Sequence, residues 1–174
     1  MLSGPSGVGK STVVARLRAS PGIWVSVSVT SRHPRPGEID GVHYLFWQRE
    51  RFKAAIAAGQ FLEWAEFAGN LYGTPAGPVD EHLATGFAVL LEIELQGARQ
   101  VRAARPDALL VFLEPPSWEL LERRLRGRGT EDDDVVEARL TTARTELAAA
   151  AEFDHQIVNY DISQTSAELV SLIL

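Results

Sequence analysis

With 174 residues, the chain is long enough for one domain with a hydrophobic core, and its 45% hydrophobic and 23% charged residues are ordinary for a globular protein. This composition excludes a disordered, collagenous or coiled-coil chain, and no apolar run approaches the roughly 20 residues that span a bilayer. The absence of cysteine excludes disulfides and thiolate chemistry, and the net charge of -6 means that an anionic ligand needs a local basic site.

Hydrophobic periodicity predicts strands and helices that alternate along the chain. We expect the first strand to begin before Met1, because the chain runs almost directly into a glycine-rich loop. The predicted helices are 10–18, 49–58, 79–85, 96–104, 117–126, 132–151 and 163–172, and the predicted strands are 24–29, 44–47, 61–67, 87–93, 109–113 and 156–158. Segments 30–41 and 69–75 are predicted as loop and turn. This order indicates a parallel sheet of about five strands with helices on both faces.

The loop before the first helix reads Gly4-Pro5-Ser6-Gly7-Val8-Gly9-Lys10-Ser11 and matches G-x-x-x-x-G-K-[ST], with Thr12 following. Glycines let backbone N–H groups surround a phosphate at a helix N-terminus. In this pattern Lys10 contacts the β- and γ-phosphates, and the Ser11 hydroxyl binds Mg²⁺. The loop therefore predicts a site for a nucleoside triphosphate with Mg²⁺, and the alternative is a chance glycine-rich turn.

Two arginines lie three residues apart in the predicted loop, within the segment Ser28-Val29-Thr30-Ser31-Arg32-His33-Pro34-Arg35-Pro36-Gly37-Glu38. Arginine forks match phosphate oxygens, and prolines reduce the entropy lost in holding a loop. The hydroxyls of Tyr44 and Tyr72 would complete a site for a monophosphate. The alternatives are a solvated basic turn and tyrosines whose rings belong to the core.

A second basic segment, 123–130, contains four arginines and two glycines that give hinge freedom. Arg139 follows Arg128 by eleven residues, about three helical turns. Phosphoryl transfer needs positioning and charge neutralisation, which a cluster of guanidinium groups can supply. For Arg123 and Arg126, arginine on the surface of an amphipathic helix is the favoured interpretation.

Six blocks of the chain, in order and at fitting spacing, resemble guanylate kinases. They are the phosphate loop, S-x-x-S-R-x-P-R-x-G-E from Ser28, G-x-x-Y-x-F from Gly41, F-L-E-W-A-x-F-x-G-N-x-Y-G-T from Phe61, L-L-E-I-x-x-Q-G-A from Leu90 and R-L-x-x-R-G-T from Arg124. The resemblance covers essentially the whole chain. It implies a P-loop kinase with a three-layer α/β core that transfers the γ-phosphoryl group of ATP to GMP, giving ADP and GDP.

The resemblance also implies a set of site residues. Gly4 to Thr12 and Asn159 would contact ATP, with Asn159 beside the adenine; Arg124, Arg128 and Arg139 would close on its phosphates; Ser28, Glu63 and Thr74 would contact guanine, and Arg32, Arg35, Tyr44 and Tyr72 the phosphate of GMP. A carboxylate suits the adjacent N1–H and N2–H₂ donors of guanine, and hydroxyls suit its O6. Without the surrounding block, Glu63 would read as a solvent-facing acid.

Glu92 and Glu94 follow the predicted strand 87–93, where parallel sheets place ligands, and both are expected in the GMP site. Here the sequence departs from the family, which usually has aspartate two residues after its first acid. Glu94 keeps the charge but adds a methylene, so its contact with guanine requires a small backbone shift or a bridging water.

We expect one domain over residues 1–174, with a core at 1–29, 86–116 and 149–174, a GMP-binding lobe at about 30–85 and a helical lid at about 117–148 that closes and excludes water. The expected partners are ATP and GMP, without nucleic acid or membrane, in the cytoplasm. The alternatives are a non-catalytic module of the same family that binds phosphopeptides, and a P-loop kinase with another nucleotide acceptor. An intact Lys10-Ser11 pair argues against the first, and Glu63 with Ser28 and Thr74 against the second.

Overall fold

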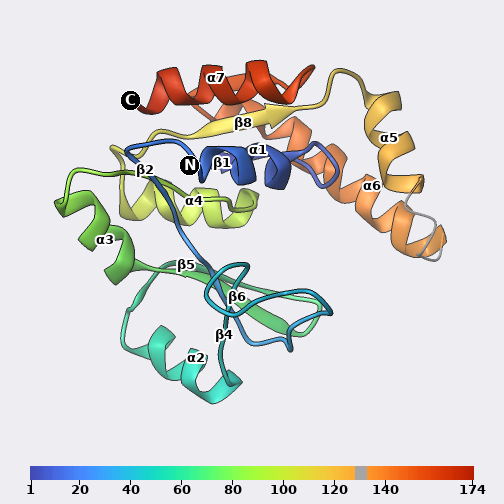
Figure 1. Cartoon of the computed structure of the whole chain (residues 1–174). Coiled ribbons are helices and arrows are strands. Elements are labelled where there is room, and N and C mark those ends of the chain that lie inside the picture. Colours follow the sequence, from blue (N-terminus) through green and yellow to red (C-terminus); the bar gives the residue numbers. More distant parts are fainter. Residues whose placement is uncertain (128–132) are drawn as a thin grey trace. The chain divides into compact units, whose positions relative to one another are not determined.

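A computed structural model describes residues 1–127 and 133–174 (Figure 1). The chain forms two compact units. Unit 1 comprises Met1–Pro21, Glu92–Leu95 and Leu109–Leu174, and unit 2 comprises Gly22–Leu91 and Gln96–Ala108. The boundaries of lobe and lid drawn from the sequence stay predictions.

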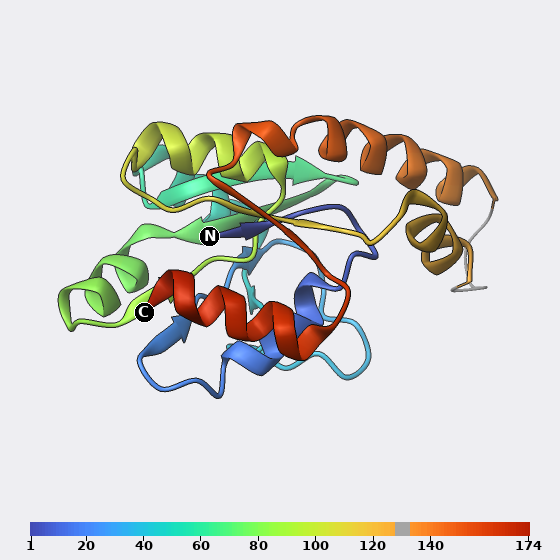
Figure 2. The same ribbon diagram turned by 90° about the horizontal axis from the view of Figure 1, so that it is seen from above.

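Unit 1 is built on a parallel three-stranded sheet in the order β1-β8-β9. Its strands are β1 (Leu2–Ser3), β8 (Val111–Glu114) and β9 (His155–Val158), and its helices are α1 (Lys10–Leu17), α5 (Trp118–Arg126), α6 (Asp133–Ala148) and α7 (Ile162–Ile173), with a 3₁₀ turn at Ala150–Glu152. Helices α1 and α7 lie side by side on one side of β8, and α6 ends on its other side (Figure 2). The central strand β8 is the most apolar of the three, as expected for a strand covered on both faces, and its Phe112 and Leu113 are fully buried.

Unit 2 combines a parallel pair with a mixed sheet in the order β4-β3-β6-β5. The pair is β2 (Ile23–Val25) with β7 (Ala88–Leu90), the mixed sheet contains β3 (Val29–Thr30), β4 (Leu45–Phe46), β5 (Phe61–Phe67) and β6 (Asn70–Pro75), and the helices are α2 (Arg49–Ala57), α3 (Ala76–Ala84) and α4 (Leu95–Ala104), the last with only Leu95 in unit 1. A small core joins α2 to the mixed sheet, in which Phe52 stacks on Phe61 with ring centroids 4.5 Å apart and packs with Val29 and Leu71. Glu63, Tyr72 and Thr74, which are expected to bind GMP, lie on β5 and β6 of this sheet.

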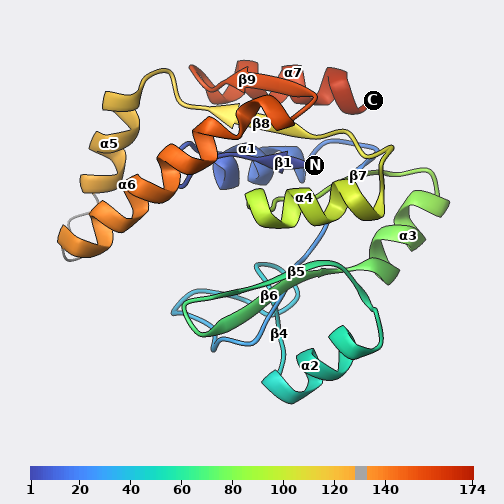
Figure 3. The same cartoon turned by 180° about the vertical axis from the view of Figure 1, so that it is seen from behind.

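The prediction of a turn over 69–75 was wrong for all but Gly69, because Asn70–Pro75 is strand β6. It pairs antiparallel with β5 in the register Trp64↔Gly73 and Phe67↔Asn70, and the hairpin is seen from behind in Figure 3. Only Ala68 and Gly69 form the turn, with φ of 48° and 74°. Two consecutive positive φ values suit the two-residue hairpin turn that matches strand twist. Pairing with β5 therefore overrides the turn propensity of Gly, Asn and Pro.

Most other elements agree with the sequence to within a few residues, and the predicted α/β class with a parallel sheet is confirmed. The predicted strand 24–29 is two strands, β2 and β3, and the predicted helix 132–151 gives way to the 3₁₀ turn after Ala148. Ser117 caps α5, with its hydroxyl accepting from the Leu120 N–H at 3.2 Å. Within the described ranges, no helix has the length and apolar character needed to cross a membrane.

Candidate active site

The glycine-rich loop connects β1 to α1 in unit 1. Gly4, Gly7 and Gly9 have φ of 144°, 83° and 105°, in the region that side chains disfavour. The loop thus has the backbone that the sequence pattern predicts, with Ser6 exposed in its middle and Lys10 half-buried where α1 begins.

Lys10 is held by its own loop, since its ammonium group donates to the carbonyls of Gly4 and, at 3.2 Å, of Pro5. Burial lowers the pKa of Lys10, and the nearby carboxylates of Glu146, Glu92 and Glu94 oppose this shift. Burial also raises the pKa of Glu146, which lies on α6. The ammonium group of Lys10 is therefore near three carboxylates, and all four residues belong to unit 1.

Ser11 donates a hydrogen bond from Oγ to Glu92 Oε1 at 2.8 Å. Two neighbouring oxygen donors fit Mg²⁺, which usually takes one or two protein oxygens and completes its shell with water and substrate phosphates. Among the described residues, no group of three or more acidic or histidine side chains is arranged to hold a metal ion. Ser11 thus fits a metal that arrives with a phosphate ligand.

The expected lid arginines are only partly described. Arg124 on α5 points Nη1 at the carbonyls of Gly7 and Val8, at the long distances of 3.4 and 3.5 Å. Arg139 is half-buried on α6. Arg128 lies outside the described residues.

Asn159, which follows β9, is 3% exposed. Its amide Nδ2 donates to the carbonyl of Val8 at 2.8 Å, and its Oδ1 accepts from the Thr165 hydroxyl at 3.0 Å. Its side chain therefore contacts the phosphate loop.

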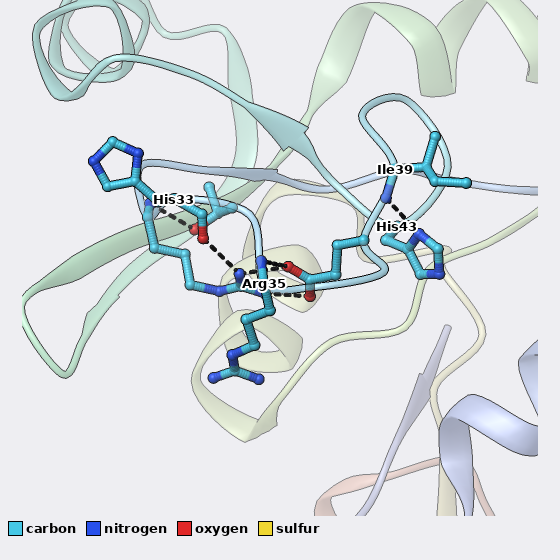
Figure 4. Close-up of polar contacts among 7 residues, drawn as sticks. His33, Arg35, Ile39 and His43 are labelled. Carbon is cyan, nitrogen blue, oxygen red and sulfur yellow. Dashed lines mark hydrogen bonds and ion pairs between the residues drawn. The ribbon is translucent and has the colours of Figure 1, made fainter.

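In unit 2, Glu38 organises the loop that contains both predicted phosphate-binding arginines (Figure 4). Its carboxylate accepts from both terminal nitrogens of Arg32 at 2.6 Å and from the Arg35 N–H at 2.7 Å. The backbone closes a turn from Arg35 to Glu38, with the Glu38 N–H donating to the Arg35 carbonyl at 3.0 Å. Pro36 and Gly37, whose φ is 85°, occupy the positions that a type II turn assigns to proline and glycine.

These bonds separate the two arginines by role. Arg32 also donates to the His33 carbonyl at 2.9 Å, and its guanidinium lies over the Tyr44 ring at 5.1 Å. The Arg35 guanidinium extends away from this network, and among the described residues it has no hydrogen-bond or ion-pair partner (Figure 4). The Arg32 hydrogen bonds and the Arg35 N–H lower the pKa of Glu38 to about 2, so the carboxylate is charged at neutral pH.

Glu63 and Thr74 lie opposite each other on β5 and β6, and both are buried. The Thr74 hydroxyl donates to Glu63 Oε1 at 2.6 Å. A hydroxyl has one hydrogen, so in this arrangement Thr74 orients the carboxylate and does not donate elsewhere. Ser28, half-buried after β2, belongs to the same unit.

The structure groups the predicted residues by unit. Glu92 and Glu94, predicted in the GMP site, belong to unit 1 with the phosphate loop, and Arg32, Arg35, Tyr44, Glu63, Tyr72, Thr74 and Ser28 belong to unit 2. Sequence reasoning assigned no role to Glu38, Glu146 or Gly97. Glu38 lay in the quoted arginine motif, whereas Glu146 had no local signal.

Gly97 on α4 leaves room for Glu63, since a Cβ there would lie 2.7 Å from Oε2. Gly97→Ala is expected to destabilise the fold by about 1–2 kcal/mol, because overpacking of the buried carboxylate outweighs the gain in helix propensity. Thermal unfolding measures the change. Gly77→Ala on α3, where a Cβ meets nothing within 4 Å, is the matched control and should be neutral or stabilising. Equal stabilisation by both variants would contradict the packing argument.

Comparison with known proteins gives one family name. The family model described as guanylate kinase matches residues 1–174. A guanylate kinase from Thermobifida fusca (strain YX) is 61% identical over 174 residues, covering 99% of this chain and 89% of that protein, and one from Synechococcus sp. (strain CC9311) is 59% identical over 170 residues, covering 97% and 90%. The crystal structure of guanylate kinase from Anaplasma phagocytophilum superposes with a TM-score of 0.77 at 33% identity, covering 98% of this chain and 81% of that one.

Proposed function

The chain belongs to the guanylate kinase family, and from this premise we propose how its side chains divide the transfer of the γ-phosphoryl group of ATP to GMP. Unit 1 supplies the donor site together with the expected Glu92 and Glu94, and unit 2 supplies the other residues expected to bind GMP. The observation that carries the choice of acceptor is the buried carboxylate of Glu63, held by Thr74 in the unit that also contains the arginine loop. The proposal applies to ATP and GMP as partners in the cytoplasm, and lid closure over about 117–148 stays part of it.

On the donor side, the loop N–H groups and Lys10 bind the β- and γ-phosphates. Lys10 must exchange the carbonyls of Gly4 and Pro5 for phosphate oxygens, which keeps its charge at the reacting end of ATP. Ser11, beside Glu92, would hold Mg²⁺, which supplies charge neutralisation at the phosphates when bound. Arg124 and Arg139, with Arg128 from outside the described residues, neutralise the charge that develops on the transferred group.

On the acceptor side, Glu63 accepts from N1–H and N2–H₂ of guanine, while Thr74 holds the carboxylate in place. Ser28 contacts O6, and a Thr74–O6 contact requires its hydroxyl to turn from Glu63. Adenine presents an acceptor at N1 toward the carboxylate, and an unpaired polar site discriminates strongly. No general base is needed, because the attacking phosphate oxygen of GMP is already anionic near neutral pH.

The test of function is ADP release with Mg²⁺ and ATP, measured with GMP, AMP, CMP and UMP in turn. We expect turnover with GMP and little with the others. Turnover with another nucleotide would make the chain a P-loop kinase of different specificity. Binding of phosphopeptide without ADP release would favour the non-catalytic alternative.

Removal of Arg35 is expected to weaken the binding of GMP and to leave the binding of ATP unchanged. Its guanidinium has no partner among the described residues and is therefore available for a phosphate, so Arg35→Ala should raise the KM for GMP by about tenfold or more, which is about 1.4 kcal/mol. Steady-state kinetics with each nucleotide varied separately measures the effect. A larger effect on ATP than on GMP would move Arg35 to the donor site.

Removal of Arg32 is expected to be more damaging than removal of Arg35, because it also leaves the Glu38 carboxylate unpaired beside an anionic ligand. Glu38→Gln in the Arg32→Ala background should recover part of the lost GMP affinity. Arg49→Ala, which breaks the exposed pair with Glu66, is the control and should change neither KM. No recovery in the double variant would contradict the role of Glu38.

A further inference from the structure

Asn159 is fixed at both ends of its amide group. The Thr165 hydroxyl donates to Oδ1 at 3.0 Å, and Nδ2 donates to the Val8 carbonyl at 2.8 Å. The reverse amide orientation would place Oδ1 against the carbonyl oxygen of Val8, two acceptors in contact, so the orientation follows from the hydrogen bonds. Both side chains are buried, Asn159 at 3% exposure and Thr165 at 2%. Little of the Asn159 side chain is available to a base, which argues against the adenine contact expected from the resemblance.

The bond to Val8 determines the direction of the next N–H group. A trans peptide is planar, with its C=O and N–H on opposite sides, and the described peptide bonds include no cis form. Because Asn159 holds the Val8 carbonyl toward the protein interior, the N–H of Gly9 points away from Asn159. Gly9 allows this approach, since a Cβ there would lie 2.7 Å from Nδ2. The helix α1 begins at the following residue, so this N–H belongs to the anion-binding end of the loop.

We propose that Asn159 is a positioning residue of the donor site, which acts through the Val8 carbonyl to aim the Gly9 N–H at the phosphates of ATP, with Thr165 as its support. The inference rests on the proposed function for the identity of the donor. The hydrogen bond from Asn159 to Val8 joins residues that are 151 positions apart in the chain, at the end of β9 and in the phosphate loop. The proposed role concerns the triphosphate of ATP and not the adenine.

The test compares ligands that share the triphosphate but not the base. Asn159→Asp keeps the shape and places an acceptor against the Val8 carbonyl. Titration calorimetry in the presence of Mg²⁺ gives the Kd of ATP and of inorganic tripolyphosphate, and competition gives that of adenosine. We expect the first two to weaken by the same factor, about tenfold or more, and the affinities for adenosine and GMP to stay within about twofold.

Two further variants sharpen the result. Thr165→Val removes the hydroxyl that orients Asn159 without touching the loop, and should give the same pattern at about threefold. It decides the question alone if Asn159→Asp does not fold. Asn70→Asp is the matched control, since its Nδ2 also donates to a backbone carbonyl, that of Ala68 at 3.2 Å, but in unit 2, and it should leave both donor ligands unchanged.

Three results would overturn the proposal. If the affinity for ATP falls while the affinity for tripolyphosphate is unchanged, Asn159 acts on the adenine base. Equal losses for ATP and GMP would indicate general destabilisation, and unchanged affinities would remove the role. Because binding is measured directly, a wild-type chain that binds ATP but does not phosphorylate GMP would overturn the proposed function, and the binding data of the variants would still decide this inference.

Discussion

Replacement of Lys10 by alanine is expected to lower kcat for GMP phosphorylation by about 10²–10³, the effect of removing one preorganised group that stabilises developing charge. Lys10 is half-buried at the phosphate loop, where burial strengthens its interaction with an anion. GMP binding should survive in part, because Lys10 belongs to unit 1 and the arginine loop to unit 2. Steady-state kinetics and GMP titration measure the two effects.

The chain offers a matched control for this variant. Lys53, on α2, is the only other lysine and is exposed, so Lys53→Ala makes the same chemical change away from the loop and should leave kcat unchanged. Lys10→Arg keeps the charge but changes its geometry and should recover little. Equal losses of GMP affinity and of kcat in Lys10→Ala would argue against separate donor and acceptor sites.

Glu63→Gln is expected to lower kcat/KM for GMP. The expected loss of transition-state stabilisation is about 2–4 kcal/mol, because a buried polar group is left without its partner. The carboxylate can accept from Thr74 through Oε1 and from guanine at the same time. The amide of glutamine has one acceptor oxygen. Its NH₂ group therefore faces either the Thr74 hydroxyl or an N–H donor of guanine. Turnover of AMP should not recover fully, since Ser28 would still suit O6. The measurement is kcat/KM for GMP and AMP in the wild type and the variant.

Glu66→Gln provides the control for Glu63, because it lies on the same strand and pairs with Arg49 at the surface. It should change kcat/KM by less than about twofold. If GMP turnover by Glu63→Gln also stays within that factor, Glu63 is a structural acid, and guanine recognition must rest on Glu94 or on backbone groups. Thr74→Val should produce a smaller loss of the same kind, because it releases the carboxylate without removing it.

Glu146 is the acid that sequence reasoning did not find. It interacts electrostatically with Lys10 from α6, near the end of a long helix that gives no motif of its own. By contrast, Glu38 lies in the arginine motif, and its roles as turn closer and as partner of Arg32 depend on contacts over three and six residues. Glu38 lies close to the arginines in the sequence, but only the structure shows that Arg32 is its partner.

The sequence by itself determined the features that arise from neighbours along the chain. The spacing of glycines in 4–11 predicted a phosphate loop, whose glycines have positive φ, and hydrophobic periodicity predicted a helix over 117–126, where α5 lies. The ordered blocks of residues also predicted the family. Backbone angles and caps depend on a few consecutive residues, so their signal survives without knowledge of the fold.

Only the tertiary structure decided what distant residues do to one another. Segment 70–75 has turn propensity but is a strand, because β5 offers it a complete ladder of partners. Asn159 binds Val8 across 151 residues, and Gly97 leaves space for the Glu63 carboxylate. Such contacts depend on which elements the whole chain brings together, and the free energy of burying them outweighs local preference, so no pattern of neighbouring residues can specify them.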